Sequence, residues 1–423
     1  MTPEVRDRID QIRQGIVPDG YTKTRSGIVP TTWTPACLGD IYTERREPGN
    51  ESLPLLTVSI HSGVSDGELD EDELPKKVKR IEDKSQYKRA ATGDLVFNMM
   101  RAWQGAIGTV RTEGMVSPAY IVARPNNKVY PLFMDYYMKT PRMVGMINRQ
   151  SYGVTDFRKR LYWDSFAPIP CVLPPVREQR KIAEILATQD KAIELQGRKI
   201  EELKRFKKGC LEKMFPRKGQ KVPEKRFPGF TDDWEQRKLT EFVEFFSGLT
   251  YTPNDVQENG TLVLRSSNVS NGEVVDADNV YVNPQVVNSE NVKVGDIVVV
   301  VRNGSRSLIG KHAQIKAFMP NTVIGAFMTG IRSECPEFTN ALLNTSRFEE
   351  EIAMNMGATI NQITGYMFSK MEFKVPCLDE QKEIGEYFEN LDHLITLHQR
   401  KLEEMKKQKK ALMQLLLTGI VRV

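Results

Sequence analysis

The chain has 423 residues, which is too long for one ordinary domain and long enough for two or three that each bury their own core. Hydrophobic residues make up 40% of it and charged residues 27%, a globular composition that excludes a disordered or collagen-like chain. No apolar run approaches the roughly 20 residues of a membrane helix, and the charged first residues do not match a secretory signal. We therefore expect a cytoplasmic protein without membrane contact.

The cysteines and histidines are too few and too scattered to hold a metal ion. Five cysteines and four histidines are spread along the chain without a CxxC pair, an HExxH motif or a paired Cys/His spacing. We therefore expect no metal site and no disulfide framework, and we expect the cysteines to be buried free thiols.

The net charge is only +5, but the positive charge is concentrated in one stretch. Residues 197–226 carry 12 Lys or Arg against 4 Asp or Glu, a net charge of +8. Such clustering suits the phosphate backbone of a nucleic acid, although a lysine run on a helix is also typical of a solvated face. The charge pattern leaves both interpretations open.

The chain contains two copies of one unit. At an offset of 202, residues 174–215 align with residues 376–417, and 15 of these 42 positions are identical. The same offset aligns the Gly-Asp-Leu-Val sequence at 93–96 with Gly-Asp-Ile-Val at 295–298. Each repeat therefore spans about 200 residues, which is too long for a solenoid unit and suits a domain followed by an appendage.

Each appendage has the periodicity of a long helix. Apolar residues recur at alternating steps of three and four, and prolines at 174, 216 and 376 mark the boundaries. The seam of the first helix comprises Ile182, Leu186, Ile193, Ile200 and Leu203. The seam of the second comprises Ile384, Phe388, Leu391, Ile395, Leu402 and Met405. We expect two helices of about 37 residues that pair through these seams as an antiparallel coiled coil.

The regions before the helices have the pattern of strands and turns. Residues 95–100 and 297–301 are short apolar runs behind a Gly-Asp turn, and Asn-Gly turn signals recur. Trp33 and Trp234, at matching positions of the repeats, are expected to anchor the domain cores. The sequence predicts an α+β fold with two similar domains separated by the paired helices. The predicted segments are an N-terminal helical segment at 1–24, a first domain at 25–173, a central helix at 174–216, a linker at 217–231, a second domain at 232–376 and a C-terminal helix at 377–423.

Motifs for catalysis are missing from the sequence. A P-loop would need GxxxxGK[ST], but the Gly-Lys pair at 310–311 is followed by His312, and the Asn/Asp-Pro-Pro-aromatic tetrapeptide of adenine methyltransferases does not occur. The sequence DEQK at 379–382 is similar to the acidic cluster of metal-dependent nucleases. Its repeat partner at 177–180 lacks both the Asp and the Lys, so the acids are better explained by the first turn of a helix. We expect no catalytic residue in this chain.

The segments that lead into the two helices carry a family resemblance. They read FAPIPCVLPPVREQRKIA at 166–183 and FKVPCLDEQKEI at 373–384, and RFPGFTDDW at 226–234 introduces the second repeat. In this doubled arrangement, which covers nearly the whole chain, they resemble the DNA-specificity subunit of type I restriction-modification systems. The first repeat departs from the pattern at 27–33, where the Arg-Phe-Pro-Gly sequence is missing.

The resemblance implies two target-recognition domains, each reading one half of a bipartite double-stranded DNA sequence, on helices that set the spacer and dock the modification subunits. It implies two modification subunits, which hold S-adenosylmethionine and methylate adenine. It also implies restriction subunits, which use ATP and magnesium. The chain itself would be non-catalytic and would hold no cofactor.

The candidate DNA-binding residues are polar or basic residues on expected loops, where they can reach the edges of a groove. Any one of them could also be a satisfied turn residue. The candidates are Asn98, Arg101, Gln104, Tyr152, Arg158, Lys159, Arg265, Asn268, Arg302, Asn303, Arg306, Asn361 and Gln362.

Two other interpretations compete with DNA recognition. The chain could be a protein-interaction scaffold in which a coiled coil joins two β-rich binding modules. A fused methyltransferase and nuclease is the enzymatic alternative, but the missing motifs disfavour it. The salt dependence of binding separates the DNA reader from the scaffold, because contacts with phosphates weaken steeply as ionic strength rises.

Overall fold

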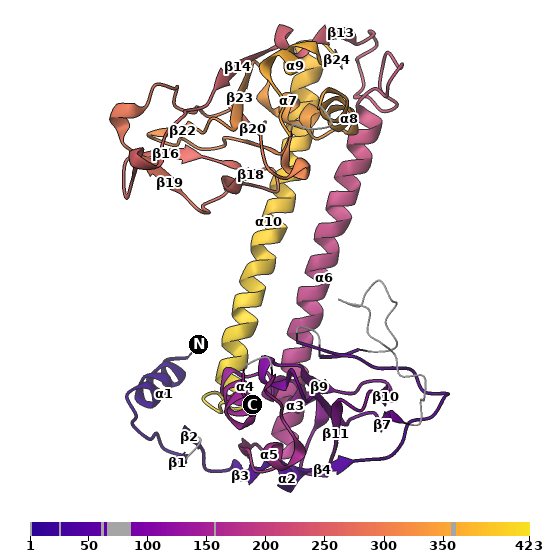
Figure 1. The fold of residues 1–423 in the computed structure, drawn as a ribbon, viewed down its shortest axis with the longest axis vertical. Coiled ribbons are helices and arrows are strands. Elements are labelled where there is room, and N and C mark those ends of the chain that lie inside the picture. Colours follow the sequence, from indigo (N-terminus) through magenta and orange to yellow (C-terminus); the bar gives the residue numbers. More distant parts are fainter. Residues whose placement is uncertain (1, 25–26, 61–62, 66–85, 156–157, 357–360) are drawn as a thin grey trace. The chain divides into compact units, whose positions relative to one another are not determined.

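The computed structural model describes residues 2–24, 27–60, 63–65, 86–155, 158–356 and 361–423. They form two compact units, unit 1 comprising Met1–Leu195 and Leu402–Val423, and unit 2 comprising Gln196–Lys401 (Figure 1). Two long helices contribute to both units, because α6 runs over Val176–Met214 and α10 over Leu378–Leu417. The predicted helices are therefore present, with 39 and 40 residues.

Unit 1 combines short strands with short helices. Its helices before α6 are α1 (Pro3–Arg13), α2 (Leu38–Ile41), α3 (Pro131–Tyr137), α4 (Pro141–Gln150) and α5 (Trp163–Phe166), with a 3-10 turn η3 (Ala102–Gln104). Its strands are β1 (Tyr21–Thr24), β2 (Gly27–Pro30), β3 (Thr34–Cys37), β4 (Tyr42–Arg45), β5 (Val58–Ser59), β6 (Gly63–Val64), β7 (Lys88–Ala90), β8 (Leu95–Asn98), β9 (Ile107–Thr109), β10 (Gly114–Val116), β11 (Tyr120–Pro125) and β12 (Pro170–Leu173).

Unit 2 repeats this plan with the same number of strands among the described residues. Its helices besides the long ones are α7 (Pro336–Leu343), α8 (Ser346–Asn355) and α9 (Gly365–Lys370), and its 3-10 turns include η7 (Ser266–Asn268) and η9 (Arg306–Leu308). Its strands are β13 (Glu235–Lys238), β14 (Val243–Ser247), β15 (Val256–Gln257), β16 (Thr261–Leu264), β17 (Val269–Ser270), β18 (Glu273–Val274), β19 (Val280–Val282), β20 (Ile297–Val300), β21 (His312–Gln314), β22 (Thr322–Ile324), β23 (Met328–Ser333) and β24 (Glu372–Val375).

The same four-stranded antiparallel sheet occurs in each unit. The strand order is β4-β11-β8-β9 in unit 1 and β14-β23-β20-β21 in unit 2. The registers match, since Val96 pairs with Val122 and Val298 pairs with Gly330. Gly93 and Gly295 introduce the equivalent strands β8 and β20 with φ angles of 92° and 94°, which glycine adopts without strain. The duplication in the sequence therefore corresponds to a duplicated α+β framework.

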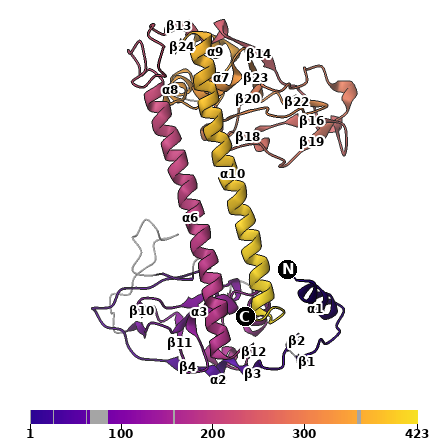
Figure 2. The same ribbon diagram turned by 180° about the vertical axis from the view of Figure 1, so that it is seen from behind.

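The first turns of each long helix belong to the core of a unit. Ile182 and Leu186 of α6 are fully buried in the core of unit 1, and both views place the sheet of this unit beside the beginning of α6 (Figures 1 and 2). Ile384 and Phe388 of α10 are buried in the core of unit 2. The heptad periodicity thus marks the buried face of each helix. At these four positions, however, that face packs in the core of a unit, whereas the sequence predicted that it would pack in a coiled-coil seam.

Farther along the helices, the seam positions differ in burial. Ile200, Leu203 and Ile395 are buried, whereas Ile193, Leu391, Leu402 and Met405 are half-buried. The two helices are linked by ion pairs within each unit. In unit 2, Lys207 Nζ donates to Asp392 at 2.6 and 2.9 Å, and in unit 1 the equivalent residues Lys409 and Asp190 form the same pair. In unit 2, Gln196 also donates to the His398 carbonyl at 2.8 Å, so the number on α10 rises as the number on α6 falls and the helices run antiparallel.

A carboxylate at the start of each long helix is held by an arginine from beyond the end of the other. Arg226 donates two hydrogen bonds of 2.7 Å to Glu380, whose side chain is fully buried. Arg422 binds Glu178 in the same bidentate way in unit 1, and Trp33 Nε1 also donates to Glu178 at 3.3 Å. The bond to Glu380 raises the pKa of Arg226 above its ordinary value, so the guanidinium stays charged.

Other expectations from the sequence meet a mixed outcome. Trp33 and Trp234 are 4% and 2% exposed, which confirms them as core residues. The cysteines are free, but only Cys171 and Cys335 are buried and Cys377 is exposed, so the expectation of uniform burial is wrong. No helix in the described ranges is long and apolar enough to cross a bilayer.

His312 of β21 is a buried titratable side chain in unit 2. The side chain is only 8% exposed, its Nδ1 lies 2.9 Å from the carbonyl oxygen of Gly310, and its ring meets Phe348 edge-on. Burial lowers the pKa of His312 below its ordinary value, and nearby Lys207 lowers it further, while the Gly310 carbonyl and Asp392 act in the opposite direction.

Acidification is therefore expected to destabilise unit 2 through His312. Below about pH 6.5 the unfolded chain binds a proton at this position that the folded chain does not, so the free energy of unfolding falls by at most about 1.4 kcal/mol per pH unit. Denaturation of the full chain between pH 7.5 and 5.5 measures this slope. His312→Gln should reduce the slope, whereas His393→Gln, at an exposed position on α10, should not. Equal slopes in the wild type and His312→Gln would contradict the assignment.

Candidate nucleic-acid interface

In unit 1, the loop after β8 carries the first group of candidate residues. Met100 N donates to Asn98 Oδ1 at 2.9 Å, and Trp103 Nε1 donates to the Met100 carbonyl at 3.0 Å. These contacts fold the loop into the 3-10 turn η3, on which Arg101 and Gln104 are exposed. The loop is therefore a defined surface that presents polar side chains.

A second segment of unit 1 lies against this loop. Leu161 N donates to the Met99 carbonyl at 2.9 Å, and the Lys159 ammonium lies 5.4 Å from the centre of the Trp103 ring. Tyr152 is paired with Arg160 through an isolated β-bridge, and its side chain is 60% exposed. The structure thus brings the predicted residues of this unit to one edge, namely Asn98, Arg101, Gln104, Tyr152, Arg158 and Lys159.

Unit 2 builds the equivalent edge with the same backbone contact. Ile363 N donates to the Val301 carbonyl at 2.8 Å, which is the bond between Leu161 and Met99 shifted by 202 residues. Arg302 forms an isolated bridge with Gln362, and Asn361 Nδ2 donates to the Gly304 carbonyl at 3.1 Å. The loop after β20 and the segment before α9 therefore join Arg302, Asn303, Arg306, Asn361 and Gln362.

A third segment, η7, completes this edge of unit 2. Asn303 Nδ2 donates to Ser266 Oγ at 3.1 Å, so η7 touches the loop after β20. Arg265, next to Ser266, donates to the carbonyl and the carboxylate of Asp278, both at 2.6 Å. The guanidinium of Arg265 is thereby fixed beside the loop.

Asn268 does not belong to this surface. It is fully buried, accepts a hydrogen bond from Arg265 N at 2.9 Å, and donates to the Ala277 carbonyl and to Asn279 Oδ1 at 2.7 and 2.8 Å. Its amide closes the turn from inside, a common role for asparagine. We therefore correct the prediction that Asn268 lies on an exposed reading edge.

Phe327 is a surface residue that the sequence did not single out. Its side chain is 57% exposed, and the Arg302 guanidinium carbon lies 5.1 Å from the centre of its ring. Val301 N donates to its carbonyl at 3.0 Å, as Met99 N donates to that of Ala119 at 3.1 Å. Ala119 therefore stands where unit 2 has Phe327, and this substitution within a shared framework had no signal in the sequence.

The electrostatic character of these edges favours an anionic partner. Residues 301–311 contain Arg302, Arg306 and Lys311 and no carboxylate, and the loop 99–106 contains Arg101 and no carboxylate. Cations without local compensation are suited to phosphates, while the amides and the guanidiniums of the same loops suit the edges of bases. Within the described ranges, no group of three or more His, Cys, Asp or Glu side chains could hold a metal ion.

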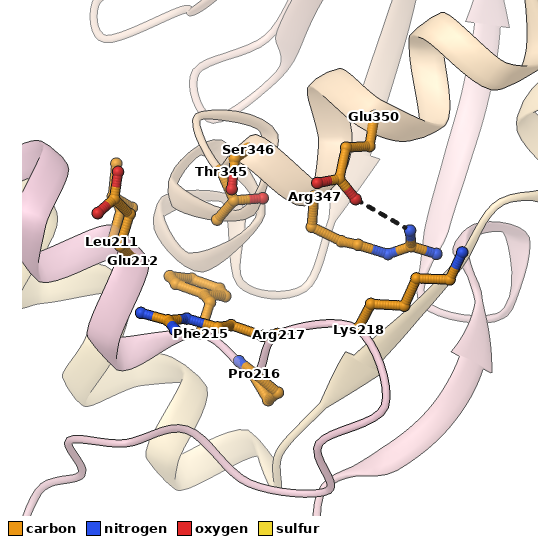
Figure 3. Close-up of a pocket in the computed structure, with 10 residues that line it drawn as sticks. All are labelled: Leu211, Glu212, Phe215, Pro216, Arg217, Lys218, Thr345, Ser346, Arg347 and Glu350. Carbon is orange, nitrogen blue, oxygen red and sulfur yellow. Dashed lines mark hydrogen bonds and ion pairs between the residues drawn. The ribbon is translucent and has the colours of Figure 1, made fainter.

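A hollow of about 400 Å³ lies in unit 2 between the end of α6 and the beginning of α8 (Figure 3). Leu211 of α6 and Phe215, which follows the helix, line one side. Arg347 of α8 and Thr345, which caps that helix, line the other, and Arg347 donates to Glu350 at 3.4 Å. Unit 1 has a counterpart of about 500 Å³, lined by the matching residues Met413, Leu417, Thr140 and Arg142. The two hollows are lined by residues of the framework that the units share, and not by the loops in which the units differ. They are therefore suited to a partner that binds both units in the same way.

Comparisons with known proteins find a family model that matches part of the chain and several similar proteins. Residues 231–407 match the family model of the type I restriction modification DNA specificity domain. The resemblance predicted from the sequence is thereby confirmed.

The curated relatives extend the similarity along the chain. The MjaVIII specificity subunit, of a type I restriction enzyme of Methanocaldococcus jannaschii, is 28% identical over 324 residues, which cover 74% of this chain and 75% of the relative. The MjaX specificity subunit of the same organism is 26% identical over 440 residues and covers 96% of this chain and 97% of its own length.

A solved structure shares the fold. The S subunit of a type I restriction-modification system from M. genitalium superposes with a TM-score of 0.55 at 13% identity, covering 91% of this chain and 96% of that chain. At this identity the likeness supports the α+β fold alone.

Proposed function

Because residues 231–407 belong to the type I restriction modification DNA specificity family and the chain is similar to specificity subunits along its length, we propose that it selects the DNA sequence for a type I restriction-modification complex. One observation carries the proposal. The same backbone framework in each unit holds an exposed, polar and basic edge, formed around the Leu161–Met99 and Ile363–Val301 bonds, and the side chains on the two edges differ.

We propose that each edge reads one half of a bipartite, double-stranded DNA target. A shared framework gives both units the same way of approaching a groove, whereas different side chains give them different base preferences. Tyr152 and Lys159 stand on the edge of unit 1, where unit 2 has Arg302 beside Phe327. The two half-sites are therefore expected to differ in sequence.

The long helices are proposed to set the distance between the half-sites and to dock the modification subunits. At 1.5 Å per residue, the 39 residues of α6 correspond to roughly 58 Å of helix. The pairs Lys207–Asp392 in unit 2 and Lys409–Asp190 in unit 1 support an antiparallel coiled coil along the helices. The hollow that recurs in each unit offers two copies of one partner the same surface.

The chemistry is proposed to lie in the partner subunits. Two modification subunits would bring S-adenosylmethionine and the adenine methyltransferase site, and restriction subunits would bring ATP and magnesium for DNA cleavage. This chain contributes binding and selection and no covalent step.

Reconstitution tests this division of labour. The purified chain alone is expected to transfer no methyl group to DNA, and methylation of specific adenines should appear once the modification subunit is added. The control is the modification subunit alone, which should not methylate the target selectively. Robust methyl transfer by the isolated chain, or the same selectivity without it, would refute the proposal.

Salt dependence separates DNA recognition from a protein-interaction scaffold. If the edges bind phosphates, the logarithm of the association constant falls linearly with the logarithm of the salt concentration, with a slope of about −0.9 for each phosphate neutralised. A complex with DNA that is weak and insensitive to salt would favour the scaffold.

A further inference from the structure

Unit 2 contains a cavity of about 680 Å³ next to its reading edge. Its walls come from the segment after β14, from η7 and from the connection between β22 and β23. Leu249, Tyr251, Val280 and Phe327 line it with apolar and aromatic surface, and Arg265 and Ser267 line it with polar groups. Its volume lies within the roughly 300 to 1,000 Å³ of sites that bind small molecules.

The cavity is built into the fold, because backbone hydrogen bonds join its walls. Leu249 N donates to the Ile324 carbonyl at 2.7 Å, Ala326 N donates to the Leu249 carbonyl at 2.9 Å, and Gly325 N donates to the Leu264 carbonyl at 2.9 Å. The approach is so close at Gly248 that an added Cβ would lie 2.1 Å from the carbonyl oxygen of Gly325. The walls are therefore set before a ligand arrives.

Two polar atoms of the lining residues are buried without a hydrogen-bond partner among the described residues. These are Arg265 Nε, which can donate, and Ser267 Oγ, which can donate or accept. Nη2 of the same guanidinium donates to the carbonyl and the carboxylate of Asp278, so the Nε–H cannot turn elsewhere without losing those bonds. Buried polar groups of this kind ordinarily have partners. Arg265 and Ser267 give the lining polar groups beside its aromatic surface, and this combination suits a flat ligand with apolar faces and a hydrogen-bonding edge.

The cavity adjoins the residues proposed to read DNA. Asn303 on the loop after β20 donates to Ser266, and Arg302 on the same loop stacks on Phe327, which is a wall of the cavity. A duplex held by that loop would lie next to the wall that Phe327 forms. DNA itself supplies flat ligands with hydrogen-bonding edges, and a base that leaves the stack regains stacking on aromatic side chains.

From these observations we infer that the cavity of unit 2 binds one nucleobase of the second half-site after it has left the duplex stack. The inference rests on the proposed DNA recognition and deepens it. Phe327 and Tyr251 would contact the faces of the base, and the polar lining residues Arg265 and Ser267 its edge. Unit 1 has Ala119 in place of Phe327, so this aromatic wall is specific to the second half-site.

The test measures the affinity of the full chain, in complex with its modification subunit, for DNA duplexes. Each duplex carries the target sequence that this complex methylates. At each position of the second half-site in turn, the opposite nucleotide is replaced by an abasic one, which removes the pairing that holds the base in the stack. At the position whose base enters the cavity, binding should become about tenfold tighter. The adenine that the modification subunit methylates should show a gain too, because methyltransferases also extrude their target base.

Variants of the cavity residues distinguish the gain in affinity at the cavity position from the gain in affinity at the methylated adenine. Phe327→Ala and Tyr251→Ala should abolish the gain at the cavity position and leave the gain at the methylated adenine. Phe318→Ala is the matched control, because Phe318 is 80% exposed and does not line the cavity. The ratio of affinities for the abasic and the intact duplex cancels any general weakening of DNA binding. Ser267→Ala should reduce the gain at the cavity position.

Two results would overturn the inference. The first is a gain in affinity at the methylated adenine and at no other position. The second is a gain in affinity at another position that remains the same in Phe327→Ala and Tyr251→Ala. In both cases the wild type would still prefer its target, and recognition of DNA would stand. If the wild-type complex showed no preference for any target sequence, the proposed function itself would fail.

Discussion

Replacing Glu380 with alanine is expected to lower the free energy of unfolding of unit 2 by about 3 to 5 kcal/mol. The carboxylate of Glu380 is fully buried and accepts both hydrogen bonds of Arg226, so the variant leaves a guanidinium that is only 15% exposed without its partner. Asp379→Ala, next to it, should change stability by less than about 1 kcal/mol, because Asp379 is 85% exposed and lies 3.9 Å from Lys382.

Amide hydrogen exchange of the full chain, measured by mass spectrometry, can follow this effect in unit 2 separately from unit 1. Exchange should accelerate in peptides from β24 and the first turns of α10. The double variant Arg226→Met with Glu380→Met should recover much of the loss, because apolar residues can replace a buried ion pair. Equal effects of Glu380→Ala and Asp379→Ala would show that the pair does not anchor the helix.

The second large effect is expected from the loop after β20. Arg302 and Arg306 are exposed cations on this loop, and one bidentate contact between arginine and guanine contributes roughly 1 to 3 kcal/mol of discrimination. The double variant Arg302→Ala with Arg306→Ala should weaken DNA binding and relax the base preference in the second half-site only. Methylation of a library of random targets by the complex with its modification subunit measures both half-sites at once.

A reciprocal variant controls for general loss of charge. Arg101→Ala with Arg158→Ala removes two exposed arginines from unit 1 and should relax only the first half-site. If either double variant altered the base preference of both half-sites equally, the two units would not act as separate readers.

The duplicated framework could be predicted because internal repetition is visible in a single sequence. The offset of 202 that aligns the helices also relates the Leu161–Met99 bond to the Ile363–Val301 bond. The periodicity likewise indicated which face of each helix is buried. The periodicity could not indicate which part of the protein that face packs against. For this reason the sequence predicts a coiled-coil seam for Ile182 and Phe388, which lie in the cores of the units.

The side chains at the polar edge of each unit were harder to predict. Polar residue types and loop positions correctly placed Arg302 and Asn361 on the loops of this edge, because a loop next to a buried strand tends to be exposed. The same reasoning failed for Asn268, since an asparagine that closes a turn from inside has the same local sequence as one that faces solvent. Phe327 was missed because its exposure depends on the contact between two distant loops.

Mapping methylated adenines in the genome of a host that carries this chain and its modification subunit, and in the same host without this chain, tests the central claim most directly. The account predicts a single bipartite and asymmetric motif, with two different half-sites separated by a fixed number of unspecified base pairs. Methylation at this motif should disappear when the chain is absent. A continuous motif without a spacer, or an unchanged pattern in the host that lacks the chain, would contradict the account.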